Sequence, residues 1–252
     1  MIRKKEYFND QTLERIIVPE KTREIGDWAF ARCRNLKSAA LPAGLERIGR
    51  EAFAGCDQLK DIYIYDKRQP DDLLRHQNVH SVLAAIAFRY FDSNQAVWDA
   101  LKAEHTGDAG ADFQGIWDGL CEIFLNKPDT DGFRPFLAGG EEDYPDEKKA
   151  LAQHCEQVHF RKAEAIWFRL LLGPQFRREF YLKALCGNDA DLVYFRTIRE
   201  NCRTAAEIYR EAGLLTEEKI PELLKDIPEG QVELRTALIE CGGRNPLEDL
   251  FL

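Results

Sequence analysis

Apolar residues in the first quarter of the chain recur with an offset of 23 residues. Leu13 is followed by Leu36 and Leu59 at this spacing, and Phe30 recurs as Phe53. Each copy opens with apolar residues at alternating positions, which is typical of a β-strand with one buried face. A period in the twenties is typical of coils that stack into a solenoid. We therefore predict a short strand at the head of each copy, stacked one above the next.

The alternation within the predicted strands separates an inward face from an outward face. The inward face is predicted to form the core, with Ile16, Val18, Ala39, Leu41, Ile62 and Ile64. The outward face carries a polar column, then an apolar to aromatic column: Arg15, Ser38 and Asp61, then Ile17, Ala40 and Tyr63. Outward columns of repeat proteins are their usual contact surfaces. These six outward residues are the predicted binding surface, and a solvated sheet face without a partner is the alternative.

Aromatic and thiol side chains recur at the same spacing behind the strands. Phe30 and Phe53, with Cys33 and Cys56, are predicted to fill one stacked column of the core on the convex side. Tyr7 lies 23 residues before Phe30. The chain around Tyr7 is therefore interpreted as an incomplete repeat that covers the open end of the stack.

The repeated motif Ile-Gly-x-x-Ala-Phe-x-x-Cys-x-x-Leu starts at Ile25 and again at Ile48. It resembles the BspA-like leucine-rich repeats that are common in bacteria and occur in some protists. The resemblance covers residues 13–65 and implies a leucine-rich repeat solenoid. Members of that family are often surface-displayed adhesion or binding proteins, so the resemblance implies a binding role.

Beyond Tyr65 a charged, proline-containing stretch is followed by helical periodicity. The first predicted helix is the candidate to cover the last repeat. The later helices are short and joined by turns that contain glycine, and they resemble the helical half of ankyrin-type repeats. Helices are predicted over 71–88, 95–104, 113–125, 146–158, 161–172, 174–185, 190–201, 204–212, 216–225 and 230–241.

These elements predict an α+β protein that is mostly α. A short leucine-rich repeat β-solenoid at the N-terminus is expected to pack on an all-helical, ankyrin-like α-solenoid. The predicted domains are residues 1–69 and 70–252, and a further boundary in the loop 126–145 is the alternative.

The distribution of charge bears on which class of partner the chain could bind. The net charge is −9, with 14 Lys/Arg and 11 Asp/Glu in residues 1–69, so the remainder carries the negative charge. An acidic chain repels phosphate backbones, which argues against a nucleic-acid partner.

We find neither a signal peptide nor an apolar stretch of about 18 residues that would span a membrane. The seven cysteines form no Cys-x-x-Cys pair and are predicted to be free thiols. We predict a cytoplasmic protein, or a surface protein if a leader has been removed.

Candidate chemistry is sparse. His76 and His80 lie four residues apart, which is half of a metal site on a helix, and His154 and His159 lie near a further cysteine, Cys155. The segment from Asp129 to Gly132 departs from a calcium loop, because alignment on its glycine places Lys127 and Ala138 at ligand positions. We predict no metal site, no cofactor and no catalytic residue.

The predicted function is protein–protein recognition or scaffolding in a bacterial cell, with another protein as the partner. Two alternatives remain open. One is an enzyme with a site at the junction of repeats and helices, using His76, His80 or the region of His154. The other is a surface adhesin.

Overall fold

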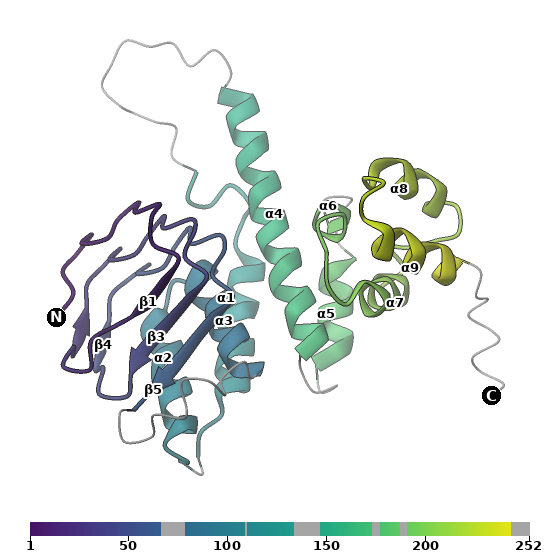
Figure 1. Cartoon of the computed structure of the whole chain (residues 1–252). Helices are drawn as coiled ribbons and strands as arrows, with labels where there is room; N and C mark the ends of the chain where they lie inside the picture. Colours follow the sequence, from purple (N-terminus) through teal and green to yellow (C-terminus); the bar gives the residue numbers. More distant parts are fainter. Residues whose placement is uncertain (67–78, 109, 134–146, 173–176, 187–190, 243–252) are drawn as a thin grey trace. The chain divides into compact units, whose positions relative to one another are not determined.

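The computed structural model describes residues 1–66, 79–108, 110–133, 147–172, 177–186 and 191–242. Its internal contacts divide the chain into two compact units, residues 1–126 and 127–252. Among these residues, the first unit contains all the strands together with three helices, and the second contains helices (Figure 1).

Parallel strands in the first unit follow the 23-residue offset. Strands β1 (Arg15–Ile17), β3 (Ser38–Pro42) and β5 (Asp61–Tyr65) form one sheet in the order β1-β3-β5. Strands β2 (Glu24–Ile25) and β4 (Arg47–Ile48) pair in a second sheet. Each pairing joins residues 23 positions apart, such as Arg15 with Ser38. The predicted strands are confirmed. Of the six residues predicted to face inward, Val18, Ala39, Leu41, Ile62 and Ile64 are buried, and Ile16 is half-buried.

An aromatic column runs through the core behind these strands. The ring centroids of Tyr7 and Phe30 lie 5.2 Å apart, those of Phe30 and Phe53 5.0 Å, and those of Phe53 and Phe88 5.6 Å. The first three rings come from successive repeats, and Phe88 comes from helix α1 (Val79–Tyr90). The predicted Phe column is therefore confirmed, and the helix that follows the repeats extends it by one ring.

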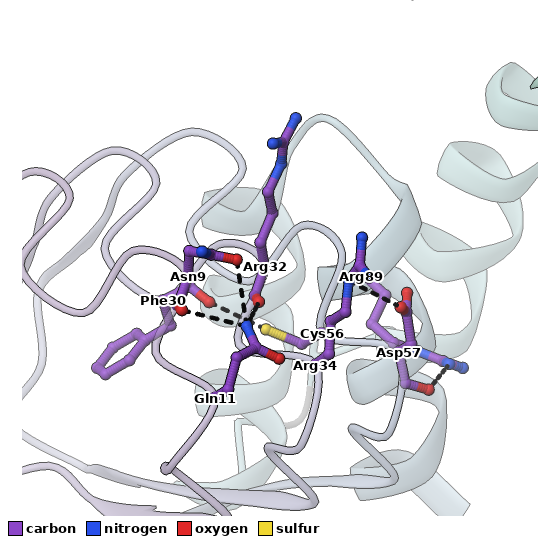
Figure 2. Close-up of polar contacts among 8 residues, drawn as sticks. All are labelled: Asn9, Gln11, Phe30, Arg32, Arg34, Cys56, Asp57 and Arg89. Carbon is purple, nitrogen blue, oxygen red and sulfur yellow. Dashed lines mark hydrogen bonds and ion pairs between the residues drawn. The ribbon is translucent and has the colours of Figure 1, made fainter.

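The two repeat cysteines form a second column. Cys33 Sγ donates to the carbonyl of Tyr7 at 2.9 Å. Cys56 Sγ donates to the carbonyl of Phe30 at 3.1 Å, as Figure 2 shows. The contact with the Cys33 thiol and burial both raise the pKa of the Cys56 thiol. Cys56 therefore stays protonated and links one repeat to the one before it.

Charged side chains at equivalent positions of neighbouring repeats pair across the stack. Each of these pairs joins residues 23 positions apart: Glu14–Lys37, Arg23–Glu46, Glu24–Arg47, Asp27–Arg50 and Arg34–Asp57. Most of these side chains are exposed, and an exposed pair contributes at most about 1 kcal/mol. The pairs therefore favour the register of the repeats more than they stabilise the unit.

Two positions in every repeat have a left-handed backbone, with φ between 51° and 71°. They are Lys5, Trp28 and Glu51 at the first position, and Asn9, Arg32 and Gly55 at the second. A side chain at positive φ places Cβ close to the carbonyl oxygen, which costs roughly 1–2 kcal/mol. Glycine avoids this cost. The repeat therefore has the same left-handed turn at residues other than glycine, which disfavour this backbone conformation.

We expect Arg32→Gly to stabilise the first unit by about 0.5–1 kcal/mol, because it removes the left-handed strain. The gain is reduced by loss of the contact of its guanidinium with the Phe8 ring, at 5.7 Å. In Figure 2 the guanidinium points away from Gln11, which bonds the Arg32 carbonyl at 2.8 Å. Urea unfolding measures the change. Arg32→Ala, which keeps the strain, is the control, and equal stability of the Gly and Ala variants would contradict the explanation.

Helices close the C-terminal end of the repeats. Helix α1 packs against β5, and α2 (Asn94–His105) packs against β4 and α1. Helix α3 (Phe113–Asn126) packs against both α1 and α2. The prediction that the first helix covers the last repeat is confirmed. The compact unit therefore extends to residue 126, beyond the domain boundary predicted at residue 69.

The second unit contains helices α4 (Glu147–Leu172), α5 (Arg178–Leu185), α6 (Asp191–Phe195), α7 (Cys202–Glu211), α8 (Ile220–Asp226) and α9 (Val232–Gly242). Helix α4 contacts α5, α6 and α7, and α9 contacts α7 and α8. The break predicted between residues 158 and 161 is wrong, because no glycine or proline interrupts α4 there. The predicted helix 190–201 is also too long, since α6 ends at Phe195. An ankyrin-like arrangement of these helices remains a prediction.

Candidate binding surface

The outward columns of the three-stranded sheet are aligned by its register. Arg15, Ser38 and Asp61 are direct partners on β1, β3 and β5, and Ile17, Ala40 and Tyr63 are partners in the next row. Arg15 is exposed, whereas Ser38, Asp61 and Tyr63 are half-buried. Ile17 is 59% exposed, and it is the only large apolar residue of the three described strands β1, β3 and β5 with such exposure. The strand face therefore combines one accessible apolar residue with polar neighbours.

Ala40 is a correction to the predicted surface. Its side chain is fully buried, at 0% exposure, although it lies on the outward row. Its single methyl group lies between the larger side chains of Ile17 and Tyr63, its register partners on the two flanking strands. Adjacent strands lie only about 4.8 Å apart, so these neighbours cover it. Ala40 therefore cannot offer a side chain to a partner.

A cavity of about 480 Å³ lies where β5 meets α1 and α2. Tyr63 and His80 line it, together with Ile62, Ile64, Ser81, Leu101, Glu104, His105, Gly107, Asp108 and Ala111. His80 Nδ1 pairs with the Glu104 carboxylate at 2.5 Å, and its Nε2 lies 3.4 Å from Gln114 Nε2. Because Tyr63 belongs to both, the cavity adjoins the strand face.

His80 was visible as a candidate in the sequence, but Glu104 was not. The two residues lie on different helices, α1 and α2, and no local spacing connects them. His76 lies outside the described residues. Among the residues that the structure describes, no group of three or more His, Cys, Asp or Glu side chains could hold a metal ion.

The histidines of α4 hold a neighbouring loop. His159 Nε2 and Lys162 Nζ both contact the Asp129 carboxylate, the latter at 2.8 Å, and His154 Nε2 lies 3.0 Å from the Asp131 carbonyl oxygen. Burial raises the pKa of Asp129, but the hydrogen bonds from Lys162 and His159 outweigh it, so the pKa is lowered. The aspartates of the rejected calcium loop thus bind side chains of α4. Cys155 is half-buried on the same helix.

The comparison with protein families supports the repeat prediction. Residues 1–71 match the model of the BspA type leucine rich repeat region (6 copies). The match includes the incomplete repeat around Tyr7 as well as residues 13–65. No curated protein and no solved structure matches the chain. The similarity therefore covers the N-terminal repeats.

None of the helices in the described ranges is both long enough and apolar enough to cross a membrane. The seven cysteines are all free thiols in the structure. Five of them are buried, namely Cys33, Cys56, Cys121, Cys202 and Cys241.

Proposed function

We propose that this chain is a protein-recognition module whose N-terminal repeats bind another protein through the outward strand face. The exposed side chain of Ile17, in line with Tyr63 and beside Arg15, is the observation that carries the proposal. Repeat proteins use such faces because successive strands present side chains at a constant spacing over a broad, rigid surface. The similarity of residues 1–71 to BspA-type repeats supports a binding role. Arg15, Ile17, Ser38, Asp61 and Tyr63 make up the proposed surface.

The enzyme alternative depends on the cavity at β5. A histidine oriented by a carboxylate, as His80 is by Glu104, is an arrangement that can serve general acid–base catalysis. The same cavity would equally receive a side chain of a bound protein, because Tyr63 connects it to the strand face. We therefore treat it as the second candidate. The adhesin alternative shares the strand face and differs in where the partner is found.

Substitution of exposed isoleucines tests the proposed surface. Proteins captured from a lysate of the source cells by the immobilised full chain are quantified by mass spectrometry. Ile17→Asp is expected to reduce the captured partner at least tenfold, because an apolar side chain lost from an interface costs about 1.5–3 kcal/mol. The matched control is Ile239→Asp on α9, since Ile239 is 61% exposed and Ile17 is 59% exposed. The control is expected to capture as much as the wild type.

Two results separate the candidates. Equal capture by wild type and Ile17→Asp would overturn the strand-face proposal. Loss of a bound molecule with His80→Gln, but not with Ile17→Asp, would favour the cavity. Circular dichroism of each variant excludes unfolding as the cause.

A further inference from the structure

The two ends of the repeat stack are closed in different ways. At the C-terminal end, side chains of α2 take the place of the backbone of a further repeat. Asn94 Oδ1 accepts from the Ala52 N–H at 3.0 Å, and Gln95 Oε1 accepts from the Ile48 N–H at 2.8 Å. Trp98 Nε1 donates to the carbonyl of Leu45 at 3.0 Å. Helix α1 covers the outer side of β5. This end of the stack is sealed in both the turn layer and the strand layer.

At the N-terminal end only the turn layer is covered. Ile2 pairs with Ile25 beside β2, and the Tyr7 N–H donates to the carbonyl of Ala29 at 2.8 Å. The described residues before Leu13 lie beside β2 and its turn, and none of them pairs with β1. Within the described ranges nothing pairs with the outer edge of β1, which is the end strand of its sheet.

Apolar residues beside this edge lack the cover that their counterparts have. Leu13 is half-buried, whereas Leu36 is 0% and Leu59 is 1% exposed. Ile16 is half-buried, whereas its register partner Ala39 is fully buried. The side chains of Leu13 and Ile16 are therefore partly exposed on the outer side of β1, whereas neighbouring coils cover the equivalent residues of the later repeats.

The backbone groups of β1 that face the open edge indicate what kind of segment could cover these side chains. Val18 N–H donates to the carbonyl of Ala40, so Ile16 and Val18 direct their backbone groups towards β3. In a parallel ladder the intervening residues point the other way. The N–H and C=O groups of Arg15 and Ile17 therefore face the open edge, where they can bond an added extended chain.

The charge of Arg15 indicates which type of residue an added chain would carry beside it. In the polar column Arg15 is followed by Ser38 and then Asp61. Equivalent positions of neighbouring repeats carry opposite charges elsewhere in the stack, as in Glu14 with Lys37. Arg15 is exposed and forms no ion pair within the part of the chain that the structure describes. An acidic residue in register with Arg15 would complement it.

We propose that an extended segment of a partner protein adds to β1 as a fourth, parallel strand of this sheet. Its apolar residues cover Leu13 and Ile16, and an acidic residue lies beside Arg15. The inference rests on the proposed function of the repeats in protein recognition, and it adds the mode of binding. The face contributes side-chain contacts through Ile17, whereas the edge contributes backbone hydrogen bonds.

A peptide with the sequence of residues 59–65, Leu-Lys-Asp-Ile-Tyr-Ile-Tyr, is the probe. In the repeat register its aspartate, copied from Asp61, lies beside Arg15, and its first isoleucine, copied from Ile62, lies beside Ile16. A fluorescein label and a solubilising tail allow binding to the full chain to be followed by fluorescence anisotropy. We expect saturable binding.

Two changes remove backbone hydrogen bonds without altering the inward packing. Ile17→Pro deletes the N–H that faces the open edge, and its expected effect is roughly tenfold weaker binding of the peptide. Ile17→Val keeps that N–H and is expected to bind within about twofold of the wild type. Methylation of the peptide nitrogen copied from Ile62, which faces β1 in this register, is expected to weaken binding roughly tenfold or more. Methylation at the position copied from Tyr63, which faces away, is the matched control.

The outcomes distinguish this inference from the proposed function. No binding of the peptide, or equal binding of both methylated forms, overturns the added strand. If Ile17→Asp reduces capture of the native partner at least tenfold but the peptide does not bind the full chain, the strand face holds and the edge proposal fails. Concentration-dependent dimers that Ile17→Pro dissociates would show that the edge pairs with a second copy, which also overturns the proposal. Circular dichroism of Ile17→Pro confirms that the chain remains folded.

Discussion

Phe53→Ala is expected to lower the free energy of unfolding of the first unit by about 3–5 kcal/mol. Phe53 is fully buried, and its ring stacks on Phe30 on one side and on Phe88 on the other. Removal of the ring leaves a cavity in the middle of the aromatic column, and it also separates the repeats from α1. Hydrogen-exchange mass spectrometry on peptides from residues 1–66 measures the loss of protection.

Tyr7→Ala is the control for this prediction. Tyr7 lies at the end of the same column, is half-buried and stacks on Phe30 alone. Because the site is partly hydrated and has one ring neighbour, we expect a loss of about 1–2 kcal/mol. If Tyr7→Ala and Phe53→Ala lower the free energy of unfolding equally, the stacking of Phe53 on Phe88 does not stabilise the packing of the repeats against α1.

Asn94→Ala is expected to destabilise the same unit by about 2 kcal/mol. Asn94 is 1% exposed, and its amide nitrogen lies 3.4 Å from the carbonyl oxygens of Phe88 and Phe91. Its Oδ1 accepts from the buried Ala52 N–H, so truncation leaves that donor without a partner. An unsatisfied buried donor costs about 1–3 kcal/mol. Three of the four tryptophans, Trp28, Trp98 and Trp117, lie in this unit, so urea unfolding followed by tryptophan fluorescence reports mainly on it.

Gln95→Ala is the matched variant one residue further along α2. Gln95 bonds the Ile48 N–H, but it is half-buried, and water can replace the lost acceptor. We expect a loss of less than about 1 kcal/mol. If Asn94→Ala is as stable as Gln95→Ala, the side chains of α2 do not act as substitutes for a further repeat.

Repetition made the first unit predictable. The same positions recur 23 residues apart, so the strands, their inward faces and the Phe and Cys columns could all be inferred by comparing one copy with the next. The helical region offered no such comparison. There the break before Arg161 was predicted in what is one continuous helix, because apolar positions around Val158 fit two short helices as well as one long one.

The sequence predicted on which face of the sheet the candidate surface residues lie, but not how exposed each side chain is. Alternation assigned Ile17, Ala40 and Tyr63 to one face, and the register confirms that they share a row. Ala40 is buried between larger side chains on two flanking strands, whereas Ile17 lies on the end strand β1 and is exposed. Likewise, the pairing of His80 with Glu104 depends on how α1 packs against α2.

The sequence by itself determined the repeat unit, its period and the residues that face its core. A 23-residue offset dictates which residues stack, since identical coils place equivalent atoms above one another. The tertiary structure decided how the stack ends, because an end is closed by residues outside the repeat pattern. Asn94 lies 42 residues, and Gln95 47 residues, beyond the backbone group that it bonds. The outer edge of β1 is open among the described residues because no further strand pairs with it.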